Sequence, residues 1–236
     1  MKNSRAKLQR HRGHSSPYRQ TKLPDVRIFG TVISTYTRIV QIACEEAGLA
    51  HEIIATPAHS PGNRHPFGKV PVVEIDGQEL YETVSIAQYI DNAHNQGALQ
   101  PANPVERAVM DRWIAVANTY LFPLFEHGLV MPHIMHNYTG TPLDTATIGK
   151  NLPNIAKTLS FLDLELQRDG AWTRGGFTLA DVFLYCILRG VESTPEGAAG
   201  IAQMQVLPHW LMSCRARPSV AATAWPGERV EGTEGP

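Results

Sequence analysis

The sequence predicts an α/β N-terminal domain followed by an all-α C-terminal domain. Three observations lead to this fold class. A strand–helix–strand pattern comes first, a strand–turn–strand–helix pattern follows it, and beyond residue 101 the apolar residues recur at helical spacing with no strand pattern. The divisions that we expect are a basic tail at 1–24, the α/β domain at 25–95, the helical domain at 101–225 and a second tail at 226–236.

The two ends of the sequence have compositions that do not favour folding. Residues 1–24 carry seven Lys and Arg residues, no Asp or Glu, and only two aliphatic residues larger than alanine. Such a segment cannot bury enough apolar surface to fold, so we expect a disordered tail. An Arg-rich, acid-poor start is also typical of organelle transit peptides, although no amphipathic stripe accompanies it here. Residues 226–236 are rich in Pro, Gly and acidic residues, which favours a flexible tail.

The first strand is expected at 26–29, where a short apolar run follows Pro24 and Asp25. A helix comes next, because apolar residues then recur at 39, 40, 42, 43 and 47, and Gly48 ends the pattern. Ser34 or Thr35 is the expected N-cap of that helix. A second strand at 51–56 completes a strand–helix–strand unit, which favours a parallel pair with a right-handed crossover.

Three prolines and two glycines make residues 57–68 a loop or a broken helix. A strand is expected at 70–75, and the Asp76-Gly77 pair that follows is a strong two-residue hairpin signal. Residues 78–81 would pair back, and Thr83 would open a helix that extends to about residue 92. The linker to the second domain is expected at 94–103, which is polar and rich in turn formers.

The second domain begins with Pro104, a residue that suits the first turn of a helix. Apolar spacing carries this helix to about Tyr120, and we expect Pro123 to interrupt it. Three further helices are expected at about 151–168, 178–188 and 208–215. Thr178 and Asp181 form a capping box with Asp in the place of Glu, which we assign to folding rather than to catalysis.

Four short stretches resemble cytosolic glutathione S-transferases. The STYTR run at 34–38 resembles the start of the first helix in the serine-type classes, such as phi and theta. FGKVPVV at 67–73 with LYET at 80–83 resembles the core of the glutathione site. FTLAD at 177–181 resembles the folding motif of the helical domain, and PHW at 208–210 with RPS at 217–219 resembles the C-terminal signature. The resemblance spans residues 26–225 and implies a thioredoxin-like first domain, glutathione as co-substrate, and a homodimer.

The chemistry of conjugation needs the thiolate of glutathione, and a free cysteine thiol has a pKa of about 8.5. Lowering that pKa by about two units requires roughly 2.7 kcal/mol of preferential stabilisation. A hydrogen bond to a charged group supplies about 1.5–3 kcal/mol, and a helix N-terminus adds about 0.3–1 kcal/mol. A hydroxyl at the start of a helix therefore suffices without a general base.

By resemblance, Ser34 is the catalytic residue. Two alternatives stay open at this point: Ser34 acts only as a helix cap, or Thr35 contacts the sulfur instead. Tyr36 lies too late in the sequence for the tyrosine-type mechanism. Ile33 occupies the position of the catalytic cysteine in related bacterial classes, which excludes cysteine chemistry.

Four residues are expected to bind the glutathione peptide. Thr83, at a helix start, offers a hydroxyl and free N–H groups to the γ-glutamyl carboxylate, and Glu82 offers a carboxylate to the ammonium group. By resemblance, Val70 precedes a cis-proline at Pro71 and presents its backbone to the cysteinyl part. Lys69 would meet the glycyl carboxylate. Three of them also have an ordinary structural role available: Thr83 as an N-cap, Glu82 as a first-turn acid and Lys69 as a solvated lysine.

The segment 122–138 is rich in soft and aromatic residues, which suits either a pocket for varied apolar electrophiles or ordinary helix packing. The spacing of His133 and His136 would suit a metal site, but no nearby carboxylate or cysteine completes one, so no metal is expected.

Composition excludes several partners. Hydrophobic residues make up 43% and charged residues 18% of the sequence, and the formal net charge is -1, so neither nucleic acid nor a membrane is an expected partner. No apolar run approaches the ~20 residues of a membrane span. The three cysteines are far apart and odd in number, which argues against disulfides and favours the cytoplasm.

Together these features predict a glutathione transferase that conjugates the thiolate to small hydrophobic electrophiles, a detoxification activity. A glutathione-dependent disulfide reductase or peroxidase on the same fold is an alternative, because it uses the same thiolate. A binding module that has kept the fold and lost turnover is a third possibility.

Overall fold

The computed structural model describes residues 24–174, 176–225 and 228. Apart from Pro24 and Glu228, the two expected tails lie outside the described residues. In the part of the chain that the structure describes, no helix combines the length and the apolar character needed to span a membrane.

The α/β domain contains one four-stranded sheet with the strand order β2-β1-β3-β4. Its elements are β1 (Val26–Gly30), α1 (Thr35–Glu46), β2 (His51–Ala55), β3 (Val72–Ile75), β4 (Gln78–Leu80) and α2 (Thr83–His94). β1 pairs with β2 in parallel and with β3 in antiparallel fashion, and β3 pairs with β4 in antiparallel fashion. This mixed sheet confirms the predicted fold class.

The turn between β3 and β4 has the backbone that its sequence predicts. Asp76 and Gly77 both have positive φ angles, 51° and 73°. Two left-handed residues make the turn whose twist matches that of the flanking strands, and an Asp-Gly pair adopts it at low cost.

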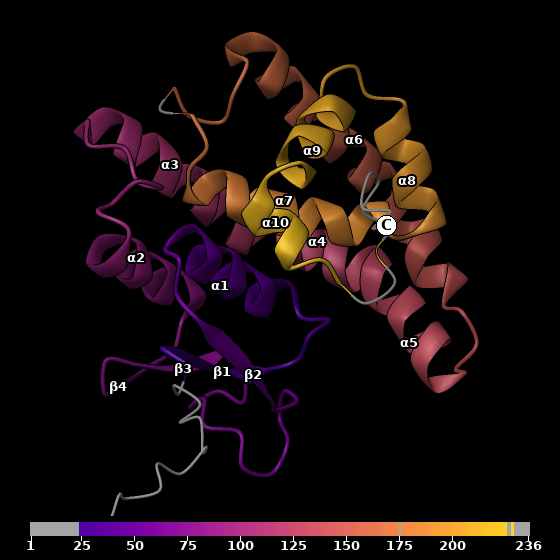
Figure 1. Cartoon of the computed structure of the whole chain (residues 1–236). Coiled ribbons are helices and arrows are strands. Elements are labelled where there is room, and N and C mark those ends of the chain that lie inside the picture. The colour runs from indigo at the N-terminus through magenta and orange to yellow at the C-terminus, as the bar shows by residue number, and fades with distance from the viewer. Residues whose placement is uncertain (1–23, 175, 226–227, 229–236) are drawn as a thin grey trace, which may run out of the picture.

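Helices α1 and α2 lie on one face of the sheet, between it and the helical domain (Figure 1). The apolar residues of α1 are fully buried, among them Ile39, Val40 and Ile42, and one side of the helix faces the sheet. The opposite side of α1 packs on α7 (Leu179–Glu192) and α10 (Pro218–Ala222). The position of the start of α1 is therefore fixed by contacts on both sides.

A single helical path runs from Pro104 to Thr139, so the predicted interruption at Pro123 is wrong. The path consists of α3 (Pro104–Val116), η1 (Ala117–Leu121), α4 (Phe122–Phe125), η2 (Glu126–Val130) and α5 (Met131–Thr139), in which η1 and η2 are π-helical. Pro123 and Pro132 are each the second residue after one of these π-helical segments. The wider turn relieves the clash between a proline ring and the preceding turn, so the path continues.

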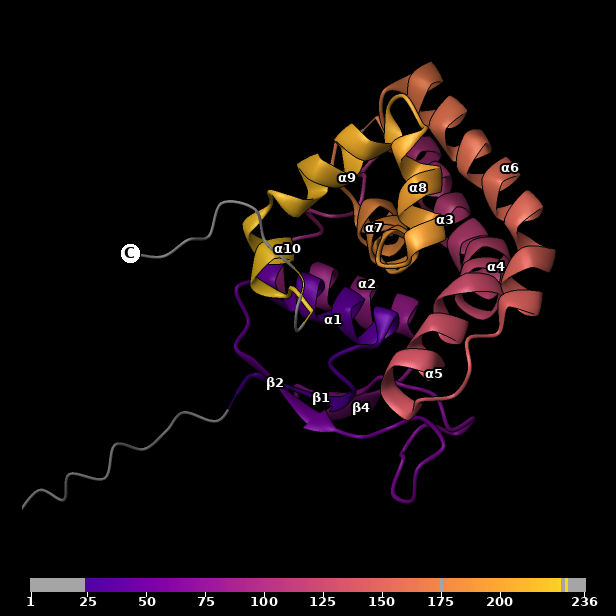
Figure 2. The ribbon, with the colours of Figure 1, turned by 90° about the vertical axis from the view of Figure 1, so that its right-hand side faces the viewer.

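The remaining helices surround α7, which Figure 2 shows nearly end-on in the middle of the helical domain. They are α6 (Thr145–Asp169), α8 (Pro195–Ala202), α9 (Leu207–Arg215) and α10. Of the fourteen residues of α7, twelve are buried. This burial fits the continuous apolar run that predicts the helix.

Two buried carboxylates connect the helices of this domain. Asp181 accepts hydrogen bonds from the backbone N–H of Thr178 at 2.9 Å and from Trp210 Nε1 at 3.2 Å, so the capping box at the start of α7 also holds α9. Asp163, on α6, accepts the backbone N–H groups of Val206 and Leu207 at 2.8 Å each. The folding role predicted for the motif at 177–181 agrees with these contacts.

Candidate active site at the start of the first helix

Ser34 is the N-cap of α1. Its backbone is extended, with φ of -75° and ψ of 125°, and its Oγ accepts the backbone N–H of Thr37 at 3.3 Å. An accepted hydrogen bond occupies a lone pair of the oxygen and leaves the hydroxyl hydrogen available. Capping and donation to a bound sulfur are therefore compatible roles for this side chain.

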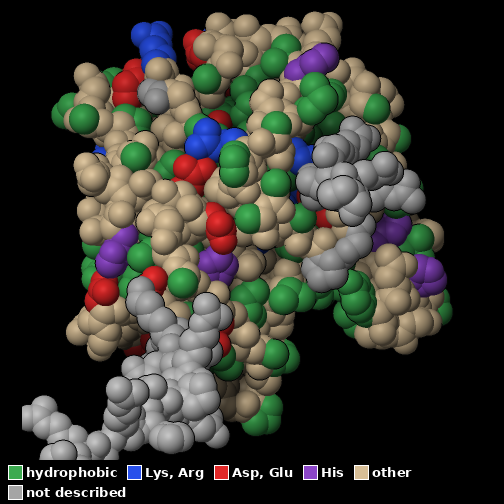
Figure 3. Space-filling view, in the orientation of Figure 1, with side chains coloured by type: hydrophobic (Ala, Val, Ile, Leu, Met, Phe, Trp, Pro, Cys, Tyr) green, Lys and Arg blue, Asp and Glu red, His purple; other side chains and the backbone are tan. Residues whose placement is uncertain are grey.

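All five residues predicted to bind or activate glutathione line one cavity of about 520 Å³. Ser34 enters it from the start of α1, and Glu82 and Thr83 enter it from the start of α2. Lys69 and Val70 enter it from the loop before β3. Figure 3 shows the surface hollowed between the α/β domain and the lobe that contains α5, the side that the start of α1 faces.

The peptide bond between Val70 and Pro71 is cis, as the resemblance predicts. Asn63 organises the loop before it: its Oδ1 accepts the N–H of His65 at 2.9 Å, and its Nδ2 donates to the carbonyl of Lys69 at 3.1 Å. Asn63 is absent from the cavity lining, so its contribution is to hold the loop that carries Lys69 and Val70.

The start of α2 offers free N–H groups to the cavity. Glu82, its N-cap, makes no side-chain capping hydrogen bond and has a φ of 68°, in the left-handed region that is strained for a residue with a Cβ. Thr83 follows it and is buried. A helix N-terminus without a side-chain cap, beside a buried hydroxyl, is a good binding place for a carboxylate.

Thr35 and Tyr36 follow Ser34 in the sequence and also carry hydroxyl groups, but these two hydroxyl groups have different surroundings from that of Ser34. Thr35 is absent from the lining of the cavity that holds Ser34 and lines a second cavity instead. Tyr36 lines the Ser34 cavity, but its hydroxyl donates to Asn118 Oδ1 at 3.0 Å. Burial and the nearby charges of Glu126 and Glu82 raise the pKa of Tyr36 well above its usual value of 10.0, so its phenol stays neutral.

Sequence reasoning missed further polar residues of this cavity, among them His65 and Asn118. His65 is buried, its Nδ1 accepts the N–H of Phe67 at 3.1 Å, and its Nε2 lies 3.7 Å from Glu82 Oε1. Because Nδ1 accepts a hydrogen bond, the proton is on Nε2 and points toward Glu82. No sequence motif marks His65 or Asn118, because their partners in this cavity, Glu82 and Tyr36, lie far from them in the sequence.

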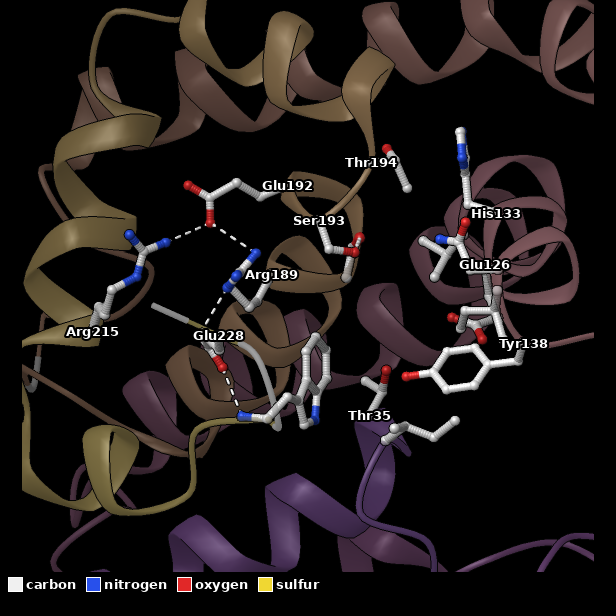
Figure 4. A pocket seen from close by; sticks show the side chains of 16 residues that line it. Thr35, Glu126, His133, Tyr138, Arg189, Glu192, Ser193, Thr194, Arg215 and Glu228 are labelled. Atoms are coloured by element: carbon white, nitrogen blue, oxygen red, sulfur yellow. Dashed lines mark hydrogen bonds and ion pairs between the residues drawn. The ribbon is translucent and has the colours of Figure 1, made fainter. Parts of the chain in front are cut away.

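The second cavity, of about 610 Å³, lies between α5 and the C-terminal helices (Figure 4). Its far wall is an ionic cluster, in which Arg189 donates to Glu228 at 2.7 Å and Arg215 to Glu192 at 2.5 Å. Residues of the aromatic segment 122–138 divide between the two cavities: Phe122, His127 and Met131 line the first, and His133 and Tyr138 line the second. Phe125 lies in the core, and Met135 and His136 line neither cavity.

His133 and His136 do not face a common partner. His133 Nε2 lies 2.8 Å from Glu196 Oε2, whereas His136 Nδ1 lies 2.8 Å from the carbonyl of Thr141. Among the described residues, no group of three or more His, Cys, Asp or Glu side chains could hold a metal ion.

Comparisons with known proteins agree with this geometry. The family model for the N-terminal domain of glutathione S-transferase matches residues 28–100. Glutathione S-transferase 4 of Zea mays is 25% identical over 211 residues, which cover 85% of this chain and 92% of the relative. Glutathione S-transferase 1 of Zea mays is 28% identical over 213 residues, which cover 84% of this chain and 95% of the relative.

A solved structure shares the whole fold. It is the theta class glutathione S-transferase of the citrus canker pathogen Xanthomonas axonopodis, with glutathione bound; the TM-score is 0.70 at 25% identity, over 85% of this chain and 97% of that chain. Because it covers 85% of this chain, the match extends well beyond the N-terminal domain. The chain thus resembles glutathione S-transferases over 84–85% of its length, and its residues 28–100 match the model of their N-terminal domain.

Proposed function

We propose that this protein is a serine-type glutathione transferase that joins the sulfur of glutathione to small hydrophobic electrophiles. One observation carries the proposal. Three segments open into the same cavity: the start of α1 with Ser34, the start of α2 with Glu82 and Thr83, and the loop with Lys69 and Val70. The cavity then offers a suitable partner to each group of glutathione: its carboxylate, its ammonium group, its peptide backbone and its thiol.

In this arrangement the γ-glutamyl carboxylate binds at the start of α2, with Thr83, and the ammonium group binds Glu82. Val70 presents backbone N–H and C=O groups to the cysteinyl residue, and the Lys69 ammonium group meets the glycyl carboxylate. The Ser34 hydroxyl donates to the sulfur and stabilises the thiolate. The sulfur lone pair then forms a bond to the electrophilic carbon, and the leaving group departs with the electrons of the bond that breaks.

The second cavity supports a place for the electrophile. It adjoins the Ser34 cavity at Glu126, and residues such as Ile33, Val130 and Ile134 give it an apolar side.

Two assays on the purified full chain test the proposal. Calorimetry should show glutathione binding, and steady-state kinetics with chlorodinitrobenzene should show conjugation. A disulfide-exchange assay with a glutathione mixed disulfide is the comparison. Binding with disulfide exchange and without conjugation would favour the reductase alternative, and absence of glutathione binding would overturn the proposal.

We further propose that the protein is a cytoplasmic homodimer with a detoxification role. Cys44, Cys186 and Cys214 are all buried free thiols, which suits a reducing compartment. The dimer proposal is supported by an exposed aromatic group next to the glutathione cavity. Phe67 and Tyr81 are 70% and 43% exposed, and their rings lie 6.0 and 5.2 Å from that of His65.

A further inference from the structure

Glu126 is the one residue among those described that lines both cavities. It begins the π-helical segment η2 and is partly buried. If glutathione binds with its sulfur at Ser34 and the electrophile binds in the second cavity, Glu126 lies where the two reactants meet. The inference below rests on that proposed function.

The carboxyl group of Glu126 has no partner within the described parts of the chain. No hydrogen bond or ion pair to it is found, and burial alone raises its pKa from 4.5 to about 7. The other two carboxylates of the second cavity differ, because Glu192 and Glu228 are each bound to arginine. A carboxyl group without such a partner retains its proton to a higher pH and is able to donate it.

The charges around Glu126 do not hold it in the ionised form. In the first cavity it faces Tyr36, which is neutral, and the cavity also contains His65, Lys69, Glu82 and His127. Figure 4 shows Glu126, His133 and Tyr138 on the α5 side of the second cavity, across from Arg189 and Glu228.

The cations of the second cavity are already paired. Arg189 and Arg215 bind Glu228 and Glu192, and His133 binds Glu196, which lies outside the lining. From α6, which also packs on η2, the nearest side chain to Gly128 is the uncharged Asn151. A glutathione thiolate at Ser34 would add a further negative charge and favour the protonated form of Glu126.

We propose that Glu126 is the general acid for electrophiles that develop negative charge on oxygen, of which α,β-unsaturated carbonyl compounds are an example. The thiolate lone pair forms the S–C bond at the β-carbon, and the electrons of the C=C bond move to give an enolate. Glu126 transfers its proton to the enolate oxygen and becomes a carboxylate. The enol tautomerises to the carbonyl product, and a solvent proton restores Glu126.

The test compares two electrophiles over pH 6–9. Benzylideneacetone is an α,β-unsaturated ketone that needs a proton on oxygen, whereas chlorodinitrobenzene loses chloride and needs none. The ratio of their kcat/KM values cancels the ionisation of glutathione, which is common to both. For the unaltered protein we expect this ratio to be constant below pH 7 and to fall with rising pH above it, as the proton of Glu126 is lost.

In Glu126→Gln we expect the ratio to be about 100-fold lower at pH 6.5, the size of effect expected of a general acid, and to be independent of pH. Glu126→Asp, which keeps the carboxyl group, should recover part of the ratio and its pH dependence. Glu52→Gln, an exposed glutamate on β2 outside both cavities, is the matched control and should leave the ratio unchanged. Calorimetry with glutathione shows whether each variant is folded.

An unchanged ratio in Glu126→Gln would overturn the inference, as would a ratio in the unaltered protein that does not vary between pH 6 and 9. A loss in Glu126→Gln that affects cationic electrophiles alone would also overturn it, because Glu126 would then bind a cation. Absence of chlorodinitrobenzene conjugation in the unaltered protein would instead contradict the proposed function itself.

Discussion

At the scale of single residues, the Ser34 hydroxyl joins a structural role to a chemical one. Its oxygen already accepts the N–H of Thr37. We expect Ser34→Ala to lower kcat with chlorodinitrobenzene about 100-fold, because about two pKa units of thiolate stabilisation, roughly 2.7 kcal/mol, are lost. The apparent pKa in the pH profile of kcat/KM should rise by about two units, while KM for glutathione changes little.

Two comparison variants make the Ser34 experiment specific. Ser85→Ala removes an exposed hydroxyl of α2 that lies outside both cavities, and it should leave kcat unchanged. Thr35→Val tests the competing hydroxyl, which faces the second cavity. The Ser34 assignment is wrong if Thr35→Val, and not Ser34→Ala, raises the apparent pKa.

At the scale of elements, a buried ionic cluster joins the end of the described chain to α1 and α7. Glu228 binds Arg38 Nη1 at 2.8 Å and Arg189 Nε at 2.7 Å, and the Glu228 and Arg38 side chains are 2% and 1% exposed. Arg38 follows Ser34 by one helical turn. The cluster therefore connects the helix that carries Ser34 with the far wall of the second cavity.

Loss of the Glu228 charge should destabilise the protein in a pH-dependent way. Burial raises the pKa of Glu228, but Arg38 and the hydrogen bonds from Trp225 and Arg189 together bring it below its usual value of 4.5. A lowered folded-state pKa contributes stability that is complete above the unfolded value and is lost as pH falls through the folded value. We expect Glu228→Gln to lower the free energy of unfolding by about 3 kcal/mol at pH 7, because Arg38 is left buried without its partner.

Urea unfolding at pH 7 and pH 4 measures this effect. The difference in free energy of unfolding between the unaltered protein and Glu228→Gln should shrink at pH 4. At that pH the unaltered protein is losing the stability that the ionised Glu228 contributes. Glu52→Gln breaks an exposed pair with Arg27 and should cost less than about 1 kcal/mol. Equal losses for the two variants at pH 7 would contradict a structural role for the cluster.

The elements of the α/β domain follow from local signals, which is why the sequence predicts them well. The Asp76-Gly77 turn, the Ser34 cap and the Gly48 stop each act within a few residues, so their effects are visible without the rest of the fold. The short helices α8 and α10 escaped prediction, because their Ala- and Gly-rich or very short sequences have no clear apolar stripe.

Prediction from sequence was weakest where the structure depends on distant contacts. The path through Pro123 continues because the π-helical segments before the prolines make room for their rings. Arg38 and Glu228 are 190 positions apart, so no local pattern predicts that they pair. Glu126 likewise looks like an ordinary helix-surface acid until the fold places it between two cavities.

At the scale of the whole molecule, the proposed dimer would cover Phe67 and support the glutathione cavity. The N–H of Phe67 donates to His65, which lines that cavity, so a partner that holds Phe67 would also steady the loop. We expect Phe67→Ser to shift the protein from dimer to monomer in sedimentation velocity and to raise KM for glutathione several-fold. Kinetics measured over a range of protein concentrations would show whether the two effects occur together.

Phe161→Ser is the matched control for that experiment, because Phe161 is also an exposed phenylalanine, at 48%, but lies on α6 away from both cavities. It should leave the sedimentation coefficient unchanged. A monomeric unaltered protein would refute the dimer proposal. If Phe67→Ser is still a dimer, the interface does not depend on Phe67 and lies elsewhere. A dimer that is lost without any change in KM would separate assembly from glutathione binding, and Phe67 would then matter to the interface alone.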